Sequence, residues 1–227
     1  MEGHVNLTFG IITEGNKDLS FLLSSIQKQL IPNYQIIIVG GEVAYEGAVH
    51  IPFDETVKKA WITKKKNIIT ENAIYGNVVY LHDYICLREG WYEGYLKFGD
   101  KFDVCMNPIL NYDGTRFRDW TLFPTFLPPE LHSRRDLLLP YSLTCLTQYQ
   151  YISGAYWVAK RDVMQKCPLN EDLCWGQEED LEWSRRVLSK YSYSINIHSI
   201  VQITKPGKDR AFSEAQEDII SDLISRR

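Results

Sequence analysis

The strongest constraint on the fold is the alternation of two hydrophobic periods along the first half of the chain. Residues Val5–Ile12, Tyr34–Val39 and Asn77–Leu81 are runs of mostly apolar side chains. Between the first two runs, from Leu19 to Leu30, apolar residues recur with the i, i+3, i+4 spacing of one helix face. Continuous apolar strands joined by helices predict βαβ units, and therefore a mostly parallel sheet with right-handed crossovers.

The remaining elements are expected around this core. In the first half, the sequence predicts a short strand near Ala48–Ile51 and a helix over Trp61–Ala73. In the second half it predicts a strand over Tyr151–Ala159, a helix over Gln177–Tyr191, a strand over Ile195–Ile203 and a terminal helix over Ala211–Arg227. Residues Met106–Tyr149 show few clear periods, so we expect an elaborated loop region there.

Composition places the chain among globular proteins. Its 227 residues suit one α/β domain, and 44% hydrophobic residues are enough for a core. The net charge of −4, without a basic stripe, argues against a nucleic-acid partner. No apolar run approaches the roughly 18 residues of a membrane span, and the N-terminus lacks the apolar segment of a signal peptide. Five scattered cysteines without CxxC spacing fit a reducing compartment, so we expect a soluble cytoplasmic protein without structural zinc.

Polar and Gly-rich clusters follow three of the predicted strands. They are Thr13–Asn16, Gly40–Glu42 and His82–Tyr84. Because ligands of parallel sheets bind beyond the carboxyl ends of the strands, these clusters predict a nucleotide pocket. The chain has no GxGxxG, no GxxxxGK[ST] and no GxSxG motif. These absences favour α/β enzymes that hold a diphosphate through a metal ion rather than through a glycine loop.

Asp83 is the candidate metal ligand, because it directly follows a buried strand and stands between His82 and Tyr84. A carboxylate in that position can bind Mg²⁺ or Mn²⁺ bridging two phosphates. The alternative is an ordinary solvated loop aspartate. Lys64, Lys65 and Lys66 could likewise face a diphosphate, although such a charge run is more often a solvated helix face.

The densest acidic cluster follows Trp175-Gly176 and comprises Glu178, Glu179, Asp180 and Glu182. Acids at a helix N-terminus are stabilised by the macrodipole, each by about 0.3–1 kcal/mol, which accounts for one or two of them. Crowded carboxylates also raise one another's pKa, which is how a general base is made. The cluster is therefore the candidate source of a base.

Several segments, in order, resemble motifs of the GT-A glycosyltransferases, especially the inverting family 2 group. In the first half, Gly10–Asn16 resembles the family's IIPTYN turn, Ile36–Glu42 its strand leading into an acidic turn, and Lys65-Lys66-Asn67 its Ala-Arg-Asn helix. Tyr80–Tyr84 resembles its FLDDD segment, and Gly90-Trp91 the Gly-Trp that often follows it. In the second half, Gly154 resembles its strand-borne glycine and Trp175–Asp180 its Trp-Gly-x-Glu-Asp segment. The resemblance covers about Val5 to Lys205. It departs from the family at His82-Asp83-Tyr84, which keeps only the middle acid of the DxD motif.

The resemblance implies one glycosyltransferase domain over residues 1–227 with a GT-A fold, a mostly parallel central sheet flanked by helices. Residues 1–100 would be the nucleotide-binding half and 101–227 the acceptor and catalytic half. It also implies a nucleoside-diphosphate-sugar donor, a glycan or other hydroxyl acceptor, and inversion at the anomeric carbon.

The family motifs imply a role for each matching residue. Thr13, Glu14, Asn16 and Glu42 would hold the nucleoside; Lys65, Lys66, Asn67, His82 and Asp83 would hold the diphosphate, the last two with Mn²⁺ or Mg²⁺; Gly154, Trp175, Gly176 and Glu178 would face the acceptor. Three adjacent acids compete for the role of base. The Glu-Asp pattern assigns it to Asp180, with Glu179 holding the acceptor hydroxyl.

Two other functions remain open at this point. A sugar-phosphate nucleotidyltransferase also uses an α/β sheet and a metal, but Thr13–Lys17 lacks its Gly-rich signature with Arg and Lys. A non-catalytic domain that binds a nucleotide sugar or a glycan is favoured by the degenerate DxD segment, whereas the intact Trp-Gly and Glu-Glu-Asp segment argues against it.

Overall fold

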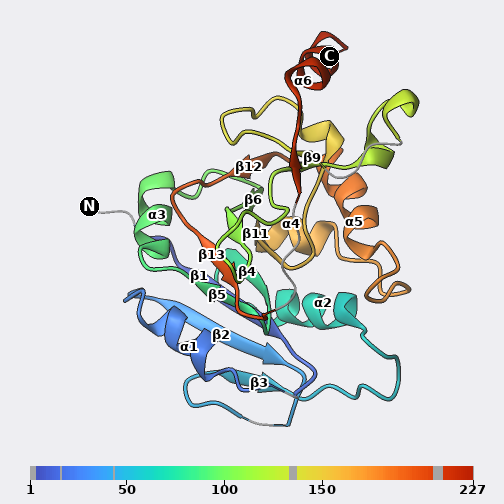
Figure 1. Ribbon diagram of the computed structural model, residues 1–227. Helices are drawn as coiled ribbons and strands as arrows, with labels where there is room; N and C mark the ends of the chain where they lie inside the picture. Colours follow the sequence, from blue (N-terminus) through green and yellow to red (C-terminus); the bar gives the residue numbers. More distant parts are fainter. Residues whose placement is uncertain (1–3, 16, 43, 133–136, 207–211, 227) are drawn as a thin grey trace.

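The computed structural model describes residues 4–15, 17–42, 44–132, 137–206 and 212–226 (Figure 1). Its centre is a seven-stranded sheet in the order β12-β6-β11-β4-β1-β2-β3. The strands are β1 (Leu7–Ile12), β2 (Tyr34–Val39), β3 (Val49–Ile51), β4 (Asn77–His82), β6 (Val104–Met106), β11 (Tyr156–Lys160) and β12 (Tyr193–Ile195). Only β11 runs antiparallel to its neighbours, β4 and β6. The predicted α/β class with a mostly parallel sheet is confirmed.

Side chains alternate across β1 and so bring different helices to the two faces of the sheet. Phe9 packs on Trp91 of α3 (Trp91–Phe98), with ring centroids 5.6 Å apart. The next residue, Gly10, faces α2 (Ile62–Asn72), where an added Cβ would collide with Ile69. Glycine is therefore needed for α2 to lie this close to the strand.

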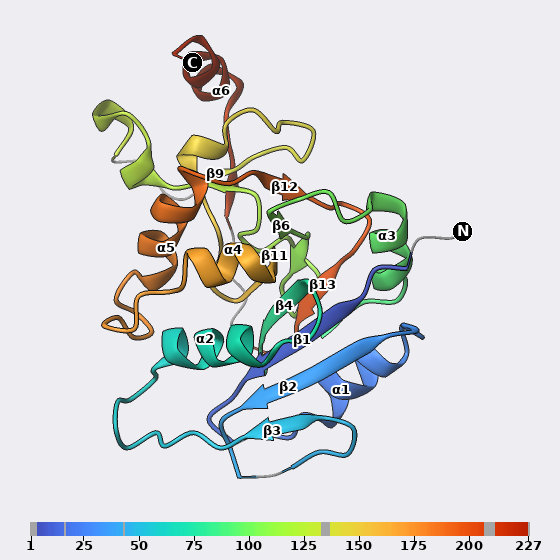
Figure 2. The ribbon, with the colours of Figure 1, turned by 180° about the vertical axis from the view of Figure 1, so that it is seen from behind.

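The helices form a layer on each side of the sheet (Figure 2). α1 (Ser20–Gln27) lies on the side of α3, because the Gln29 side chain just beyond it accepts the Tyr92 N–H of α3. α2 packs beside α4 (Arg161–Lys166) on the other side. The sequence predicts β1, β2, β3, α2 and β4 to within two residues, and α1 ends at Gln27 rather than Leu30. The helices α3 and α4 were not predicted.

The second half is built from shorter pieces than the sequence predicts. A three-stranded sheet contains β5 (Ile85–Leu87), β7 (Ile109–Leu110) and β13 (Val201–Ile203), and a four-stranded sheet contains β8 (Thr121–Leu122), β9 (Leu137–Leu138), β10 (Gln150–Tyr151) and β14 (Ser213–Glu214). Three 3-10 turns lie at Pro124–Phe126, Pro129–Leu131 and Thr147–Tyr149. Helices α5 (Glu179–Leu188) and α6 (Glu217–Ser225) complete the fold. Strands of two or three residues leave no readable period.

Two predicted strands are each divided in the structure. The strand expected over Tyr151–Ala159 is interrupted between Tyr151 and Tyr156, where the Gly154 N–H donates to the Asp180 carboxylate instead of to a neighbouring strand. The strand expected over Ile195–Ile203 becomes β12 and β13, in different sheets. Asn196 turns the chain there, because its side-chain amide donates to Ser199 Oγ at 2.9 Å. In both places a hydrogen bond to a polar side chain replaces the strand ladder.

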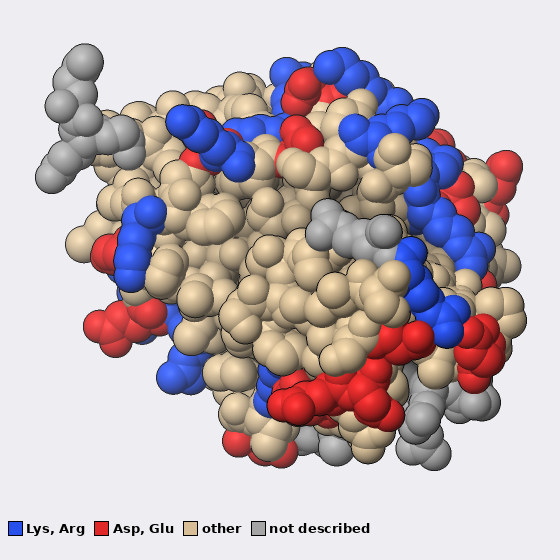
Figure 3. All heavy atoms as spheres, turned by 90° about the horizontal axis from the view of Figure 1, so that it is seen from above, with Lys and Arg blue, Asp and Glu red and all other residues tan. Residues whose placement is uncertain are grey.

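The surface carries charges of both signs on the face nearest α6. Figure 3 shows basic side chains along one side of this face and a largely uncharged middle. Within the described residues, no helix is long and apolar enough to cross a membrane.

Candidate active site

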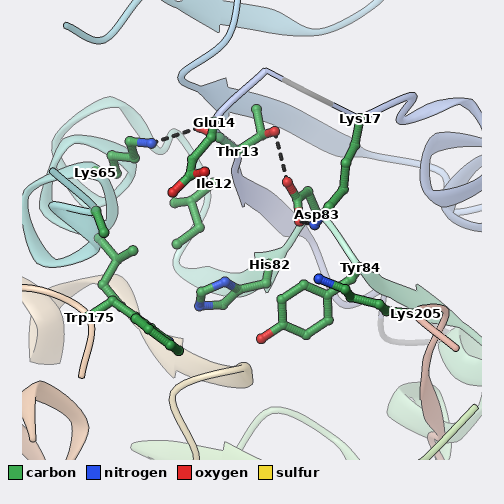
Figure 4. Close-up of a pocket in the computed structure, with 12 residues that line it drawn as sticks. Ile12, Thr13, Glu14, Lys17, Lys65, His82, Asp83, Tyr84, Trp175 and Lys205 are labelled. Atoms are coloured by element: carbon green, nitrogen blue, oxygen red, sulfur yellow. Dashed lines mark hydrogen bonds and ion pairs between the residues drawn. The ribbon is translucent and has the colours of Figure 1, made fainter. Parts of the chain in front are cut away.

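Two adjoining pockets lie where β1 and β4 end. The first, called here the lysine pocket, is lined by Thr13, Glu14, Lys17, Lys65, His82, Asp83, Tyr84, Trp175 and Lys205, among others (Figure 4). The second, the acidic pocket, is lined by Glu178, Glu179 and Asp180 with Gly154, Tyr151 and Arg118, among others. Most of the polar side chains singled out in the sequence thus lie at the carboxyl ends of the parallel strands, where parallel sheets bind their ligands.

The pairing of β4 with β11 explains why the two pockets adjoin. Because β11 runs antiparallel, its first residues lie beside the last residues of β4, and the His82 N–H donates to the Ala155 carbonyl at 3.2 Å. Gly154 and Asp83 are thereby brought to the same end of the sheet from distant parts of the sequence.

Asp83 is held firmly at the back of the lysine pocket. Its side chain is only 9% exposed. One oxygen accepts a hydrogen bond from the Thr13 hydroxyl at 2.9 Å, and the other lies 2.5 Å from the ammonium of Lys17. The Thr13 hydroxyl oxygen also accepts the Gly15 N–H at 3.0 Å, so the turn after β1 and the turn after β4 are tied together.

Lys65 projects toward the same turn from α2. Its ammonium donates to the Thr13 carbonyl at 2.7 Å and forms an ion pair with Glu55. Gly40 packs close beneath, with φ +102°, and a Cβ there would meet the Thr13 carbonyl. A glycine is required both by the left-handed backbone and by the close approach. Lys65 therefore fixes the turn that lines the lysine pocket.

The acidic pocket is formed by the start of α5. Asp180 accepts the Gly154 N–H on one oxygen at 3.1 Å and the Leu181 N–H on the other at 3.0 Å. A Cβ on Gly154 would lie 3.2 Å from the Asp180 carboxylate, so this approach favours glycine. Just before the helix, Glu178 has φ +58°, an uncommon left-handed conformation for a residue with a side chain. Such conformations gather at functional sites.

The electrostatics behind the acidic pocket are set by burial. Glu179 is 7% exposed, and burial, reinforced by Asp180, raises the pKa of its carboxyl. Lys66 lies fully buried behind these acids, where it donates to the Gly154 carbonyl at 2.7 Å and its ammonium stands 4.2 Å from the Trp157 ring centroid. Burial lowers the pKa of Lys66 to about 8, against the opposing attraction of Glu179 and Asp180.

Three side chains line both pockets: His82, Tyr84 and Trp175. Trp175 is 64% exposed, although its backbone N–H is anchored on the Ala60 carbonyl at 3.1 Å. Figure 4 shows its indole reaching toward His82. A large aromatic face held in solvent at a junction of two pockets is suited to stacking on a ring of a ligand.

Most of the residues singled out in the sequence converge here, but not all. Thr13, Glu14, Lys65, His82 and Asp83 line the lysine pocket; Gly154, Trp175, Gly176, Glu178, Glu179 and Asp180 line the acidic pocket. Asn16 lies outside the described residues.

Three of the predicted nucleotide ligands lie outside both pockets. Glu42 is exposed beside β2, and Lys66 points toward Gly154. Asn67 is buried and exchanges two hydrogen bonds with the backbone of Leu169, at 2.9 and 3.0 Å. The structure thus gives Lys66 and Asn67 supporting contacts within the protein instead of contacts in a pocket.

Sequence inspection missed Lys17, Lys205 and Arg118, all of which line a pocket. Lys17 directly follows the turn after β1, and Lys205 comes two residues after β13. Position after a strand was therefore an available signal, although an isolated lysine carries no pattern of its own.

The donor set around Asp83 does not fit a divalent metal. Among the described residues, no three His, Cys, Asp or Glu side chains come together as metal ligands. Mg²⁺ and Mn²⁺ prefer several oxygen ligands, but the Lys17 ammonium lies against one oxygen of Asp83 and the Thr13 hydroxyl against the other. The expected metal site on His82 and Asp83 is therefore not supported by their surroundings.

Comparisons with known proteins agree with this fold at low sequence identity. No protein-family model matches the chain, and no curated protein does either. The structure of S. aureus TarS 1-349 in complex with UDP is similar with a TM-score of 0.60 and 12% identity, over 88% of this chain and 61% of that one. A longer S. aureus TarS structure gives a TM-score of 0.59 and 10% identity, over 97% of this chain and 38% of that one. This chain therefore spans less than two thirds of each TarS structure. The structural similarity shows that its fold is that of the GT-A glycosyltransferases.

Proposed function

We propose that this chain transfers a sugar from a nucleoside-diphosphate sugar to an acceptor hydroxyl, with inversion at the anomeric carbon and Asp180 as the base. The observation that carries the proposal is the position of the Asp180 carboxylate. It lines the acidic pocket, which shares His82, Tyr84 and Trp175 with a pocket lined by three lysines. A base and a site for a departing anion in two adjoining pockets suit a direct displacement.

The lysine pocket is the proposed site of the donor. The ammonium groups of Lys17 and Lys205 suit the phosphates, because lysine is a common phosphate ligand. Thr13 and Glu14 would lie against the nucleoside, and Trp175 would stack on a ring of the donor. TarS was crystallised with UDP, which supports a nucleoside-diphosphate donor here.

The acidic pocket is the proposed site of the acceptor. The Asp180 carboxylate takes the proton of the acceptor hydroxyl while the oxygen forms its bond to the anomeric carbon. The bond from that carbon to the phosphate oxygen breaks at the same time, and its electron pair leaves on the diphosphate. A positioned base of this kind contributes a factor of about 10²–10⁴.

The surrounding residues keep the base in place. Asp180 is oriented by the N–H groups of Gly154 and Leu181. Glu179, whose carboxyl has a raised pKa, would hold the acceptor hydroxyl, and Glu178 and Gly176 line the same pocket. Because the donor set at Asp83 does not fit a divalent metal, no step of this mechanism is assigned to one.

A donor screen tests the proposal. The wild-type protein is incubated with nucleoside-diphosphate sugars of several bases and sugars, and release of the nucleoside diphosphate is followed. One donor should be turned over by the wild type and far more slowly by Asp180→Asn. Asp172→Asn, an exposed acid of the same segment outside both pockets, is the matched control and should keep wild-type activity. Binding of nucleotides without turnover of any donor would favour the non-catalytic binding domain instead.

A further inference from the structure

The lysine pocket contains an ion pair in the place where the sequence suggests a metal. Lys17 Nζ lies 2.5 Å from Asp83 Oδ1 and 5.1 Å from the centroid of the Tyr84 ring. An ammonium group has three N–H donors, so the bond to Asp83 leaves capacity for phosphate oxygens. The Lys17 side chain is 35% exposed, which keeps that capacity open to a ligand.

The surroundings of the Asp83 carboxylate suit it to orient a cation. Its side chain is almost buried, and the Thr13 hydroxyl fixes the oxygen that Lys17 does not use. The hydroxyl is itself fixed by the Gly15 N–H. A carboxylate restrained in this way holds the flexible lysine side chain in one position, which lowers the entropy lost when the ammonium meets a ligand.

A second cation enters the pocket from the other end of the chain. Lys205 lines the lysine pocket and is exposed. Its backbone is positioned by the preceding residue, Thr204, whose N–H donates to the Tyr84 carbonyl at 2.8 Å and whose hydroxyl donates to the same oxygen at 3.1 Å. Figure 4 shows Lys17 and Lys205 approaching the side of the pocket where Asp83 and Tyr84 lie.

We infer that Lys17, oriented by Asp83, and Lys205 together bind the diphosphate of the donor in place of a divalent metal ion. The inference rests on the proposed function and adds how that site handles the charge of the leaving group. Lys65 does not join them, because it is committed to Glu55 and the Thr13 carbonyl. Asp83 is then a positioning residue, and the two lysines stabilise the negative charge that grows on the diphosphate.

Calorimetry with free nucleotides tests the inference on the whole chain. UDP, GDP, CDP and ADP are titrated in EDTA and then in Mn²⁺, without any acceptor. The nucleotide that binds should do so with the same affinity in both buffers. Binding in Mn²⁺ that disappears in EDTA overturns the inference and leaves the proposed function standing. If no nucleotide binds in either buffer, the proposed donor site itself is wrong.

Variants separate a direct contact from general charge. Lys17→Met and Lys205→Met should each weaken nucleotide binding about tenfold or more, as expected for a lost charge-assisted hydrogen bond. Lys64→Met is the matched control, because Lys64 is similarly exposed (32%) and paired with Glu171 at 3.0 Å, but outside the lysine pocket. It should bind nucleotide as the wild type does. Equal effects of all three substitutions would overturn the inference.

Asp83→Asn distinguishes a positioning residue from a metal ligand. As a positioning residue, Asp83 should be partly replaceable, so the variant should bind more weakly than the wild type but remain insensitive to EDTA. Its binding should also depend less on Lys17, so adding Lys17→Met should cost less than in the wild type. If the variant instead abolishes a metal-dependent affinity, Asp83 is a metal ligand and the inference fails. Circular dichroism of each variant checks that it is folded.

Discussion

The two pockets differ in charge although they share one wall. In the lysine pocket, two of the cations are already paired, Lys17 with Asp83 and Lys65 with Glu55. In the acidic pocket, three consecutive acids crowd the start of α5, and the cation behind them, Lys66, is buried and weakly basic. Under the proposed function, this difference makes the site polarised: the lysine pocket would hold the negative leaving group, and the acidic pocket would accept the proton.

Removing the proposed base should have the largest effect on the difference between the two pockets. Asp180→Asn keeps the size of the side chain but cannot take a proton at neutral pH. Steady-state kinetics should show kcat reduced on the order of 10²-fold or more with little change in the KM for donor, since a base acts mainly in the transition state.

Neighbouring acids provide the control for this substitution. If Asp180→Asn stays active while Glu179→Gln or Glu178→Gln is inactive, the acidic pocket holds the base at a different position. Normal turnover by all three variants would mean that the acidic pocket does not supply the base.

The shared wall is tested by Trp175→Ala. Stacking of a base on an aromatic side chain contributes about 1–3 kcal/mol, so donor or nucleotide affinity should fall about fivefold or more. The melting temperature should hardly change, because the side chain is 64% exposed. Phe21→Ala, at 66% exposure on α1 and outside both pockets, is the matched control and should leave affinity unchanged. Unaltered affinity of Trp175→Ala would show that the wall does not contact the donor.

We expect the buried Lys66 to make the stability of the folded protein depend on pH. Burial lowers the pKa of Lys66 from 10.5 to about 8, so between these values the unfolded chain binds a proton that the folded chain does not. The stability of the wild type should therefore rise with pH relative to Lys66→Met, by up to about 1.4 kcal/mol per pH unit. Urea unfolding at several pH values from 7 to 10 measures the difference. Parallel curves for the two proteins would mean that Lys66 is not buried as a weak base.

Glu179 should give the smallest effect. Burial raises the pKa of its carboxyl above the ordinary 4.5, so the folded protein holds this proton to higher pH than the unfolded chain does. The stability that this proton provides is lost as pH rises through the folded pKa. Glu179→Gln should therefore melt higher than the wild type at pH 7, and the gap should shrink toward pH 4.5. A gap that grows on acidification would contradict the assigned burial.

How much of this could be predicted from sequence depended on the length of each element. β2 was predicted to the residue, because six consecutive residues, Tyr34–Val39, form one uninterrupted, largely apolar run. The strands of the second half are mostly two or three residues long, which is too short for a period to show. Their positions follow from buried polar contacts such as those of Asn196, which only the folded chain reveals.

The site was predictable where residues follow a long strand or begin a helix. Asp83 and the Glu178–Asp180 cluster reached the two pockets as expected. Consecutive residues of α2 did not stay together, because side chains on a helix diverge by roughly 100° per residue. Lys65 consequently reaches the pocket, whereas Lys66 and Asn67 turn to the Gly154 and Leu169 backbones. Lys17 and Lys205 are distant in the sequence, and only the fold brings them to the same pocket.

The most direct test of a polarised site is the stereochemistry of the transferred sugar. Under the proposed function, a base in the acidic pocket would direct the acceptor at the face of the anomeric carbon opposite a diphosphate held in the lysine pocket. Proton NMR of the product formed from a donor of known configuration reports the outcome through the coupling of the anomeric proton. We expect complete inversion, and a product with retained configuration would contradict direct displacement by an acceptor that Asp180 activates.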